Sequence, residues 1–323
     1  MLKKLLPLVL ALALLLTACG PAAQISSQPE DDSLQVVATT YPVYLFAQEV
    51  TRNADNVTVT CMINQAVGCL HDYTLSIKDM KILDRADLLV LSGAGLEDSM
   101  ADAIASANCP QIDCSAGIQL LESCHEHDHA HDHDLDASEE AEEDDHGHHH
   151  EHDNHIWMDP LRAGQMIQNL ADGLAQADPA NAETYQANAA AAGELLAQAH
   201  GEIAASLANL SCRELITFHD GFAYFADTFG LTILRAIEEE AGSEASAHDV
   251  VELLEEIEHH ALPAIFTEVN GGTATAEMIQ RECGVAIYTL DMMMSGPTDD
   301  TGGVLTYLAR IKQNADTIQE AYL

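Results

Sequence analysis

Short apolar runs rich in β-branched residues alternate with amphipathic segments from residue 34 onward. Runs of this kind are typical of buried strands, and their alternation with helical segments predicts parallel sheets covered by helices. Strands are expected at residues 34–40, 57–63, 87–93, 111–118, 215–219, 231–237, 264–268 and 285–291, and helices at 44–51, 76–85, 247–260 and 275–283. The pattern predicts an α/β protein with two (β/α) lobes.

A long amphipathic segment lies between the two sets of strands. Apolar side chains recur there at steps of three and four residues, as on one face of a helix: Tyr185, Ala192, Leu196, Ala199, Ile203, Leu207 and Leu210. A single helix over residues 180–210 would be about 45 Å long at 1.5 Å per residue. We expect it to join a first lobe, residues 34–179, to a second lobe, residues 211–323, and to limit hinge closure between them.

The N-terminus has the features of an export signal. Lys3 and Lys4 precede an apolar run that ends in Leu-Thr-Ala-Cys, with Cys19 as the last residue. This ending resembles the lipobox of bacterial lipoproteins, although a plain signal peptide would also fit. We expect a signal at residues 1–18, lipidation of Cys19, and a flexible tether over residues 19–33. The exported body would then be anchored to the outer face of the cytoplasmic membrane, in a periplasm or at a cell surface.

Residues 124–154 form a tract unlike the rest of the chain, with ten His, thirteen Asp or Glu, and no Lys or Arg. Such a tract cannot bury enough apolar surface to fold, so we expect a disordered loop within the first lobe. The density of imidazoles predicts metal binding of low structural specificity. Removal of residues 125–153 is expected to lower the amount of metal bound and to spare any tight site elsewhere.

Charge and cysteine content narrow the possible functions. The 323-residue chain has 12 Lys and Arg against 53 Asp and Glu, a formal net charge of −41. This charge excludes nucleic-acid binding, because phosphate backbones would be repelled.

Seven cysteines follow Cys19, and export permits disulfides, but their pairing is left open. There is no Cys-x-x-Cys pair, which disfavours a thiolate zinc site, although Cys69, two residues before His71, stays a candidate.

Metal-capable side chains gather near the carboxyl ends of the expected strands, where open α/β sheets bind ligands. They are His71, His155, His219, Glu268 and Asp291. Each alone could be a core, capping or loop residue. Three imidazoles and one carboxylate, shared between two lobes, would form a four-coordinate site suited to Zn²⁺.

The order of several motifs resembles one protein family. These motifs are His71-Asp72-Tyr73 with Ser76-x-x-Asp79, Gly93-x-Gly95-Leu96-Glu97, His155-Ile156-Trp157-Met158-Asp159-Pro160, Thr217-Phe218-His219-Asp220 with Tyr224-Phe225, Phe266-Thr267-Glu268 and Leu290-Asp291. In this order, and with a His-rich insertion before the second motif histidine, the chain resembles the zinc-binding cluster A-I (cluster 9) substrate-binding lipoproteins of bacterial ABC transporters.

The resemblance implies a metal held between the lobes by His71, His155 and His219 with an acid or water. Manganese-binding relatives typically have Glu in place of His219, so the imidazole favours Zn²⁺. Some zinc-binding members have an acid directly before the first histidine, where this chain has Leu70. Asp291 therefore becomes the preferred fourth ligand and Glu268 the second choice.

The predicted function is high-affinity capture of Zn²⁺ outside the cytoplasm by a monomer, and its delivery to an ABC permease driven by an ATPase. Zinc affinity is expected to fall below about pH 6.5, because imidazoles must be neutral to bind metal. The alternatives are a manganese or other divalent-metal binding protein of the same family, a zinc buffer, an adhesin, or a zinc hydrolase. A hydrolase is disfavoured because no segment predicted to be helical carries a His-Glu-x-x-His motif, and no enzymatic activity is expected.

Overall fold

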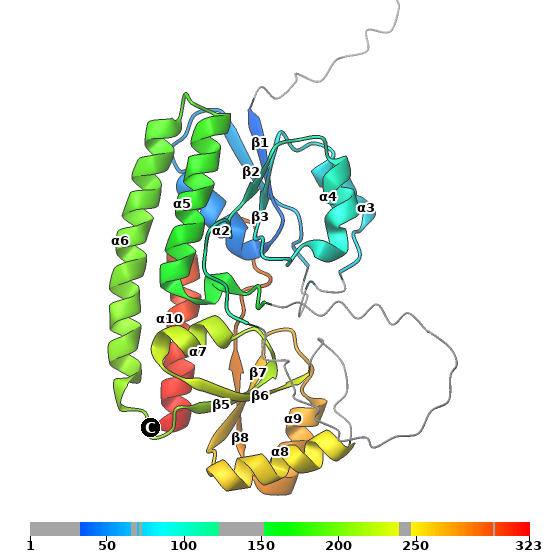
Figure 1. The fold of residues 1–323 in the computed structure, drawn as a ribbon, viewed down its shortest axis with the longest axis vertical. Coiled ribbons are helices and arrows are strands. Elements are labelled where there is room, and N and C mark those ends of the chain that lie inside the picture. The colour runs from blue at the N-terminus through cyan, green and yellow to red at the C-terminus, as the bar shows by residue number, and fades with distance from the viewer. Residues whose placement is uncertain (1–32, 66–69, 71–72, 123–151, 239–246, 300) are drawn as a thin grey trace, which may run out of the picture. The chain divides into compact units, whose positions relative to one another are not determined.

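Two four-stranded parallel sheets organise the computed structural model (Figure 1). The first has the order β2-β1-β3-β4, with β1 at Leu34–Ala38, β2 at Val57–Cys61, β3 at Leu88–Leu91 and β4 at Gln111–Asp113. The second has the order β6-β5-β7-β8, with β5 at Glu214–His219, β6 at Thr232–Glu238, β7 at Ala264–Glu268 and β8 at Ala286–Leu290. Two parallel α/β lobes, as the sequence predicts, are confirmed.

The structure describes residues 33–65, 70, 73–122, 152–238, 247–299 and 301–323. His71, Cys19, Cys69 and all but three residues of the His-rich tract, His152 to Asn154, lie outside this part. Within it, no helix has both the length and the apolar character needed to cross a membrane. The cysteines in the described part, Cys61, Cys109, Cys114, Cys212 and Cys283, are free thiols.

The helices of the first lobe begin at local sequence signals. Helix α2 (Tyr41–Val50) starts after Thr40 with Pro42 in its first turn, a position that needs no backbone N–H donor. Helix α3 (Ile77–Leu83) starts with a capping box, in which Ser76 and Asp79 each accept the other's backbone N–H. The lobe also contains η1 (Asp98–Met100), α4 (Ala101–Ser106), η2 (Ile156–Met158) and α5 (Pro160–Ala177).

The predicted long helix between the lobes is confirmed as α6, Ala182–Ser206, followed by the 3₁₀ turn η3, Leu207–Asn209. Helix α6 packs against α2 and α5 of the first lobe and against the C-terminal helix α10 (Val304–Tyr322). Its buried face carries the predicted positions Tyr185, Ala192, Leu196, Ala199 and Ile203. Helices α5, α6 and α10 therefore form one layer beside both sheets (Figure 1).

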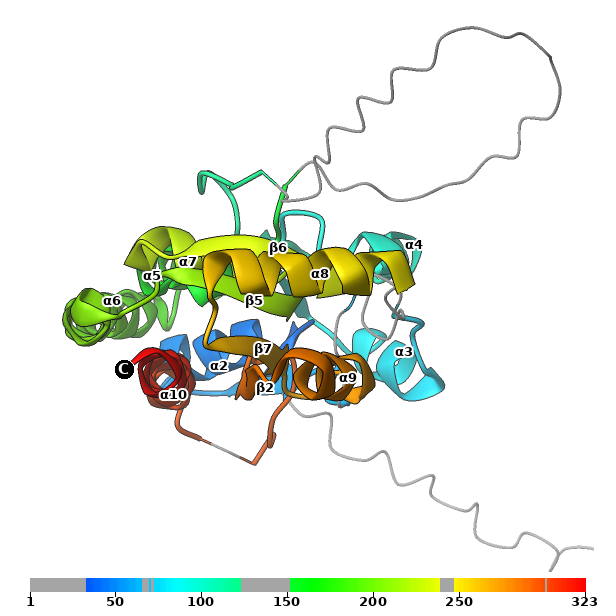
Figure 2. The ribbon, with the colours of Figure 1, turned by 90° about the horizontal axis from the view of Figure 1, so that it is seen from below.

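The second lobe has its own smaller core. Helices α8 (Ala247–His260) and α9 (Ala274–Cys283) contact each other and cover one face of the second sheet (Figure 2). Phe218, Ile265, Leu253 and Ile279 are buried in this layer. Helix α7 (Ala223–Phe229) follows β5 and ends at Gly230, which adopts a left-handed conformation.

A larger core is continuous between the lobes. It contains Val36 of β1, Met166 of α5, Phe266 of β7 and Ile311 of α10. Two buried hydrogen bonds also cross between the lobes at Trp157: its indole Nε1–H donates to the carbonyl of Met292 at 2.9 Å, and its own carbonyl accepts the Tyr307 hydroxyl at 2.7 Å. The lobes are thus tied together next to the two candidate histidines of the described part.

Candidate metal centre

His219 is the last residue of β5, an interior strand of the second sheet. The strand is buried along five of its six residues, because apolar side chains occupy both of its faces. The imidazole therefore lies at the carboxyl end of a rigid element, and only 1% of the residue is exposed. This is the end of the sheet where α/β proteins bind their ligands.

His155 comes from the first lobe and lies just before η2, which leads into α5. Asp159 caps α5 by accepting the backbone N–H of Leu161 at 2.8 Å, and Pro160 begins the helix. The Trp157 ring packs edge-on against the His155 ring, with centroids 5.3 Å apart. These contacts anchor the short segment that carries the imidazole, and His155 as a whole is 1% exposed.

The two imidazoles meet between the lobes. The ring centroids of His155 and His219 are 5.4 Å apart, and the ring planes are inclined by 83°. Two buried imidazoles in contact are uncommon in an apolar core, because each carries polar nitrogens that require partners. Imidazoles brought together from two lobes are the kind of donor that a borderline metal ion such as Zn²⁺ prefers.

An aspartate orients one of these rings. Asp153 Oδ1 accepts the backbone N–H of His155 at 2.7 Å and lies 2.9 Å from its Nδ1. A carboxylate at this distance accepts the Nδ1–H proton, so Nε2 is the nitrogen through which His155 would bind a metal ion. Asp153 is 5% exposed, which shields this bond from water.

Glu268 ends β7, beside β5 in the second sheet. Thr217 pairs with Phe266, so two residues further along both strands His219 and Glu268 occupy neighbouring strand ends. Glu268 is 4% exposed, and Gly271 lies close enough that an added β-carbon would be 2.8 Å from Glu268 Oε1. The structure therefore places a buried carboxyl group near the histidine.

Asp291 follows the last residue of β8, and its carboxylate faces α10. Arg310 donates to Asp291 Oδ2 at 3.1 Å, and the backbone N–H of Met293 donates to Oδ1 at 2.7 Å. Outer contacts of this kind orient ligating carboxylates, and each oxygen keeps a second lone pair. The carbonyl of the next residue, Met292, accepts the Trp157 indole N–H, and the Trp157 ring contacts His155.

His71 lies outside the described residues, although residues on both sides are described. Leu70 is buried, and its carbonyl accepts the backbone N–H of Tyr73 at 3.0 Å. Among the described residues, no three His, Cys, Asp or Glu side chains have the spacing of a metal site. The structure thus brings His155 and His219 together and leaves the position of His71 untested.

The Gly93-x-Gly95-Leu96-Glu97 motif forms a separate buried turn. Glu97 accepts hydrogen bonds from Thr39 Oγ1 at 2.6 Å and from the backbone N–H groups of Ser92 at 2.8 Å and Gly93 at 3.1 Å. Burial raises the pKa of Glu97 to about 7 despite these donors. Through these contacts Glu97 stabilises the first sheet, at the ends of β1 and β3.

Three residues near the histidines are not singled out individually by the sequence pattern. Asp153 reads as one more acid of the His-rich tract, although its place two residues before His155 is a usable signal. Gly221 looks like an ordinary loop glycine, yet an added β-carbon would lie 3.1 Å from His219 Cδ2 and 3.4 Å from His155 Cδ2. Tyr224 belongs to a recognised motif, but nothing in the sequence places its hydroxyl beside Asp153, 2.8 Å from the carbonyl.

Comparison with known proteins places this geometry in context. The sequence model of a family described as ZnuA, zinc-uptake complex component A periplasmic, matches residues 36–321. The chain is 28% identical to the zinc-binding lipoprotein AdcA of Streptococcus pneumoniae strain R6 over 311 residues, which cover 95% of this chain and 58% of that protein. It is 26% identical to the high-affinity zinc uptake system protein ZnuA of Bacillus subtilis strain 168 over 319 residues, covering 98% and 96%.

A solved structure agrees with these sequence matches. A crystal structure of ZnuA, 26% identical in sequence, has a TM-score of 0.74 and covers 90% of this chain and 100% of its own. The chain spans 56% to 58% of the length of the streptococcal AdcA relatives that it matches.

Proposed function

The chain belongs to the family of the periplasmic zinc-uptake component A, and on that premise we propose that it captures Zn²⁺ outside the cytoplasmic membrane and delivers it to an ABC permease. The observation that carries the proposal is the meeting of two buried imidazoles from different lobes, with centroids 5.4 Å apart. The zinc-binding relatives in sequence support the same metal.

The proposed ligands are His71, His155 and His219, with Asp291 as the oxygen ligand and Glu268 as the second choice. The Asp153 contact supports His155, because it makes Nε2 the metal-binding nitrogen. The Arg310 contact supports Asp291, because a charge-assisted hydrogen bond to Oδ2 orients the carboxylate. A carboxylate would also offset part of the metal's charge beside neutral imidazoles.

Zinc is preferred to manganese because of the donor atoms. Imidazole nitrogen suits Zn²⁺, whereas Mn²⁺ favours carboxylate and carbonyl oxygen. The rings of His155 and His219 meet between the lobes, and each would offer one nitrogen to the metal ion. With His71 the set would contain three imidazoles and one oxygen, which is a common zinc environment.

The proposed partners are a membrane permease and its cytoplasmic ATPase. We assign residues 1–18 to a signal peptide and Cys19 to lipidation, which would anchor a monomeric body to the outer face of the cytoplasmic membrane through residues 19–33. Transport proteins of this kind bind and release their cargo unchanged, so we assign no catalytic step to the metal centre.

The test is a competitive calorimetric titration of Zn²⁺ and Mn²⁺ into residues 20–323, with residues 123–151 replaced by a short Gly/Asn turn. We expect one tight zinc equivalent that manganese does not displace. His219→Ala should lower the zinc affinity by more than ten- to hundredfold, which is the loss typical when a residue that only hydrogen-bonds to a metal ligand is replaced. His200→Ala is the matched control, because its imidazole bonds to Thr228 near the end of α7 and is not among the proposed ligands. Displacement by manganese, or an unchanged His219→Ala variant, would refute the proposal.

A further inference from the structure

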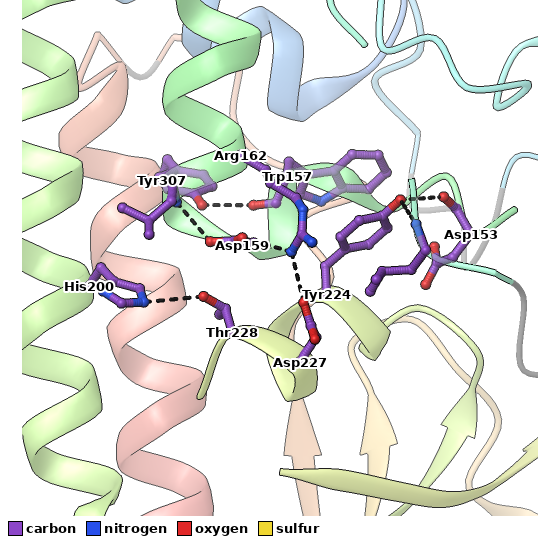
Figure 3. A network of polar contacts seen from close by, with 11 residues as sticks. Asp153, Trp157, Asp159, Arg162, His200, Tyr224, Asp227, Thr228 and Tyr307 are labelled. Atoms are coloured by element: carbon purple, nitrogen blue, oxygen red, sulfur yellow. Dashed lines mark hydrogen bonds and ion pairs between the residues drawn. The ribbon is translucent and has the colours of Figure 1, made fainter. Parts of the chain in front are cut away.

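The hydroxyl of Tyr224 joins two stretches of the first lobe. It accepts the backbone N–H of Leu121 at 3.0 Å and donates to the carbonyl of Asp153 at 2.8 Å (Figure 3). Leu121 and Asp153 are also bonded to each other, from the Asp153 N–H to the Leu121 carbonyl at 3.0 Å. Because Tyr224 belongs to α7 of the second lobe, its hydroxyl fixes Asp153 from across the lobe boundary.

Asp153 passes this constraint to the metal centre. One of its oxygens, Oδ1, contacts both the backbone N–H and the ring Nδ1 of His155. A shift of the Asp153 backbone would therefore move or release the imidazole. Carboxylate partners of this kind orient a ligating histidine and fix which nitrogen carries the proton.

The Tyr224 ring is itself held in place. The Arg162 guanidinium lies over the ring, 5.0 Å from its centroid, and forms ion pairs with Asp159 at 2.9 Å and Asp227 at 3.0 Å (Figure 3). Burial raises the pKa of Tyr224 to about 12, so the hydroxyl keeps the proton that it donates. The ring is completely buried, which leaves the hydroxyl little freedom to turn elsewhere.

Tyr224 also lies close in sequence to the other histidine. Only four residues separate it from His219, and one of them, Gly221, packs against both imidazoles. Tyr224, which closely follows His219 in the chain, therefore holds the backbone just before His155. We propose that Tyr224 is a positioning residue of the metal centre, which holds Asp153 and, through it, the His155 ring in register with His219. This inference rests on the proposed zinc-binding function.

The test compares two tyrosine-to-phenylalanine variants. Tyr224→Phe removes the hydroxyl and keeps the ring under Arg162. Tyr322→Phe is the matched control, because its buried hydroxyl donates to the Glu214 carbonyl at 2.6 Å, near the far end of β5 from His219. In a competition titration with a fluorescent zinc chelator, Tyr224→Phe should weaken zinc binding about tenfold, whereas Tyr322→Phe should leave it unchanged. Both variants should lose a comparable amount of thermal stability.

A second measurement needs no metal. In long-range ¹H–¹⁵N spectra of the metal-free protein, His155 should appear as the Nδ1–H tautomer, and Tyr224→Phe should add the Nε2–H tautomer. Equal affinities in the two variants together with an unchanged His155 tautomer would overturn the inference. Absence of tight zinc binding in the unmodified protein would instead refute the proposed function, and the tautomer measurement would still test the role of Tyr224.

Discussion

Gly221 lies so close to Met292 that a β-carbon added to the glycine would come within 2.3 Å of the methionine sulfur. The same added carbon would crowd the rings of His219 and His155. The backbone of Gly221 is not left-handed, so the requirement for glycine is one of space. A residue without a side chain lets the loop after β5 pass directly beneath the two imidazoles.

Gly221→Ala should therefore weaken zinc binding. The added methyl group must displace the buried Met292 side chain or move an imidazole, and overpacking of this kind costs about 1–3 kcal/mol of stability. A chelator competition titration measures the zinc affinity, and thermal unfolding measures the stability.

The matched control is Gly193→Ala in α6, where an added β-carbon meets nothing within 4 Å. Alanine is the better helix former, so this variant should be more stable by about 0.5–1 kcal/mol and bind zinc normally. Unchanged zinc affinity in Gly221→Ala would show that the close packing of this loop does not matter to the metal centre.

The two candidate acids can be separated by amide substitutions. Asp291→Asn should reduce zinc affinity more than Glu268→Gln, because it removes the charged oxygen proposed to bind the metal and keeps the side-chain size. Isothermal titration of both variants gives the comparison. A larger loss of zinc affinity in Glu268→Gln would identify Glu268 as the oxygen ligand instead. Glu268 is buried at the strand end beside His219.

Glu97 predicts a pH dependence of stability in the first lobe. Burial raises its pKa from an ordinary 4.5 to about 7 in the folded protein. Between these values the folded state binds more protons than the unfolded state, so the free energy of unfolding falls as pH rises from about 4.5 to about 7. A pKa shift of this size corresponds to a change of about 3 kcal/mol in the free energy of unfolding.

Urea unfolding at pH 4.5, 6 and 8 measures this contribution in the protein and in its Glu97→Gln variant. The free energy of unfolding of the unmodified protein, relative to that of Glu97→Gln, should fall across this range and then level off. Glu194→Gln, at an exposed position on α6, should show the same pH dependence as the unmodified protein. Parallel curves for the protein and Glu97→Gln would contradict a carboxyl group that titrates near pH 7.

Replacement of residues 123–151 should lower the total zinc bound and leave the tight site intact. Glu122 and His152 form an antiparallel bridge, so a short turn can join the two ends. The replacement must stop before Asp153, because that residue contacts His155; removal of residues 125–153 would damage the centre that it is meant to spare. Stoichiometry and affinity come from one titration, and loss of the tight equivalent would show that the tract contributes ligands to it.

Much of the fold could be predicted from local sequence. The strand at 264–268 and the helix at 247–260 are observed with the predicted ends, since apolar runs and amphipathic periodicity are strong there. Other boundaries were wrong by a few residues. Helix α2 begins at Tyr41, three residues earlier than predicted. Thr40 and Pro42 mark its start, but the residues around them are so uniformly apolar that the helical periodicity is weak there.

The metal centre could be predicted only as a set of candidate residues. Strand ends identify His219 and Glu268, but the contact between His155 and His219 depends on how two lobes pack, which local pattern does not encode. The same holds for the pairing of Asp291 with Arg310, 19 residues later on α10. The place of His71 in the centre stays a prediction.

The most direct test of the account is a crystal structure of the zinc-loaded protein, with residues 123–151 replaced by the short turn, recorded at the zinc absorption edge. The account predicts one anomalous peak between the lobes, about 2.0–2.1 Å from a nitrogen of each of His71, His155 and His219 and about 2.0–2.2 Å from a carboxylate oxygen. A tightly bound zinc whose peak lies away from His155 and His219 would contradict it.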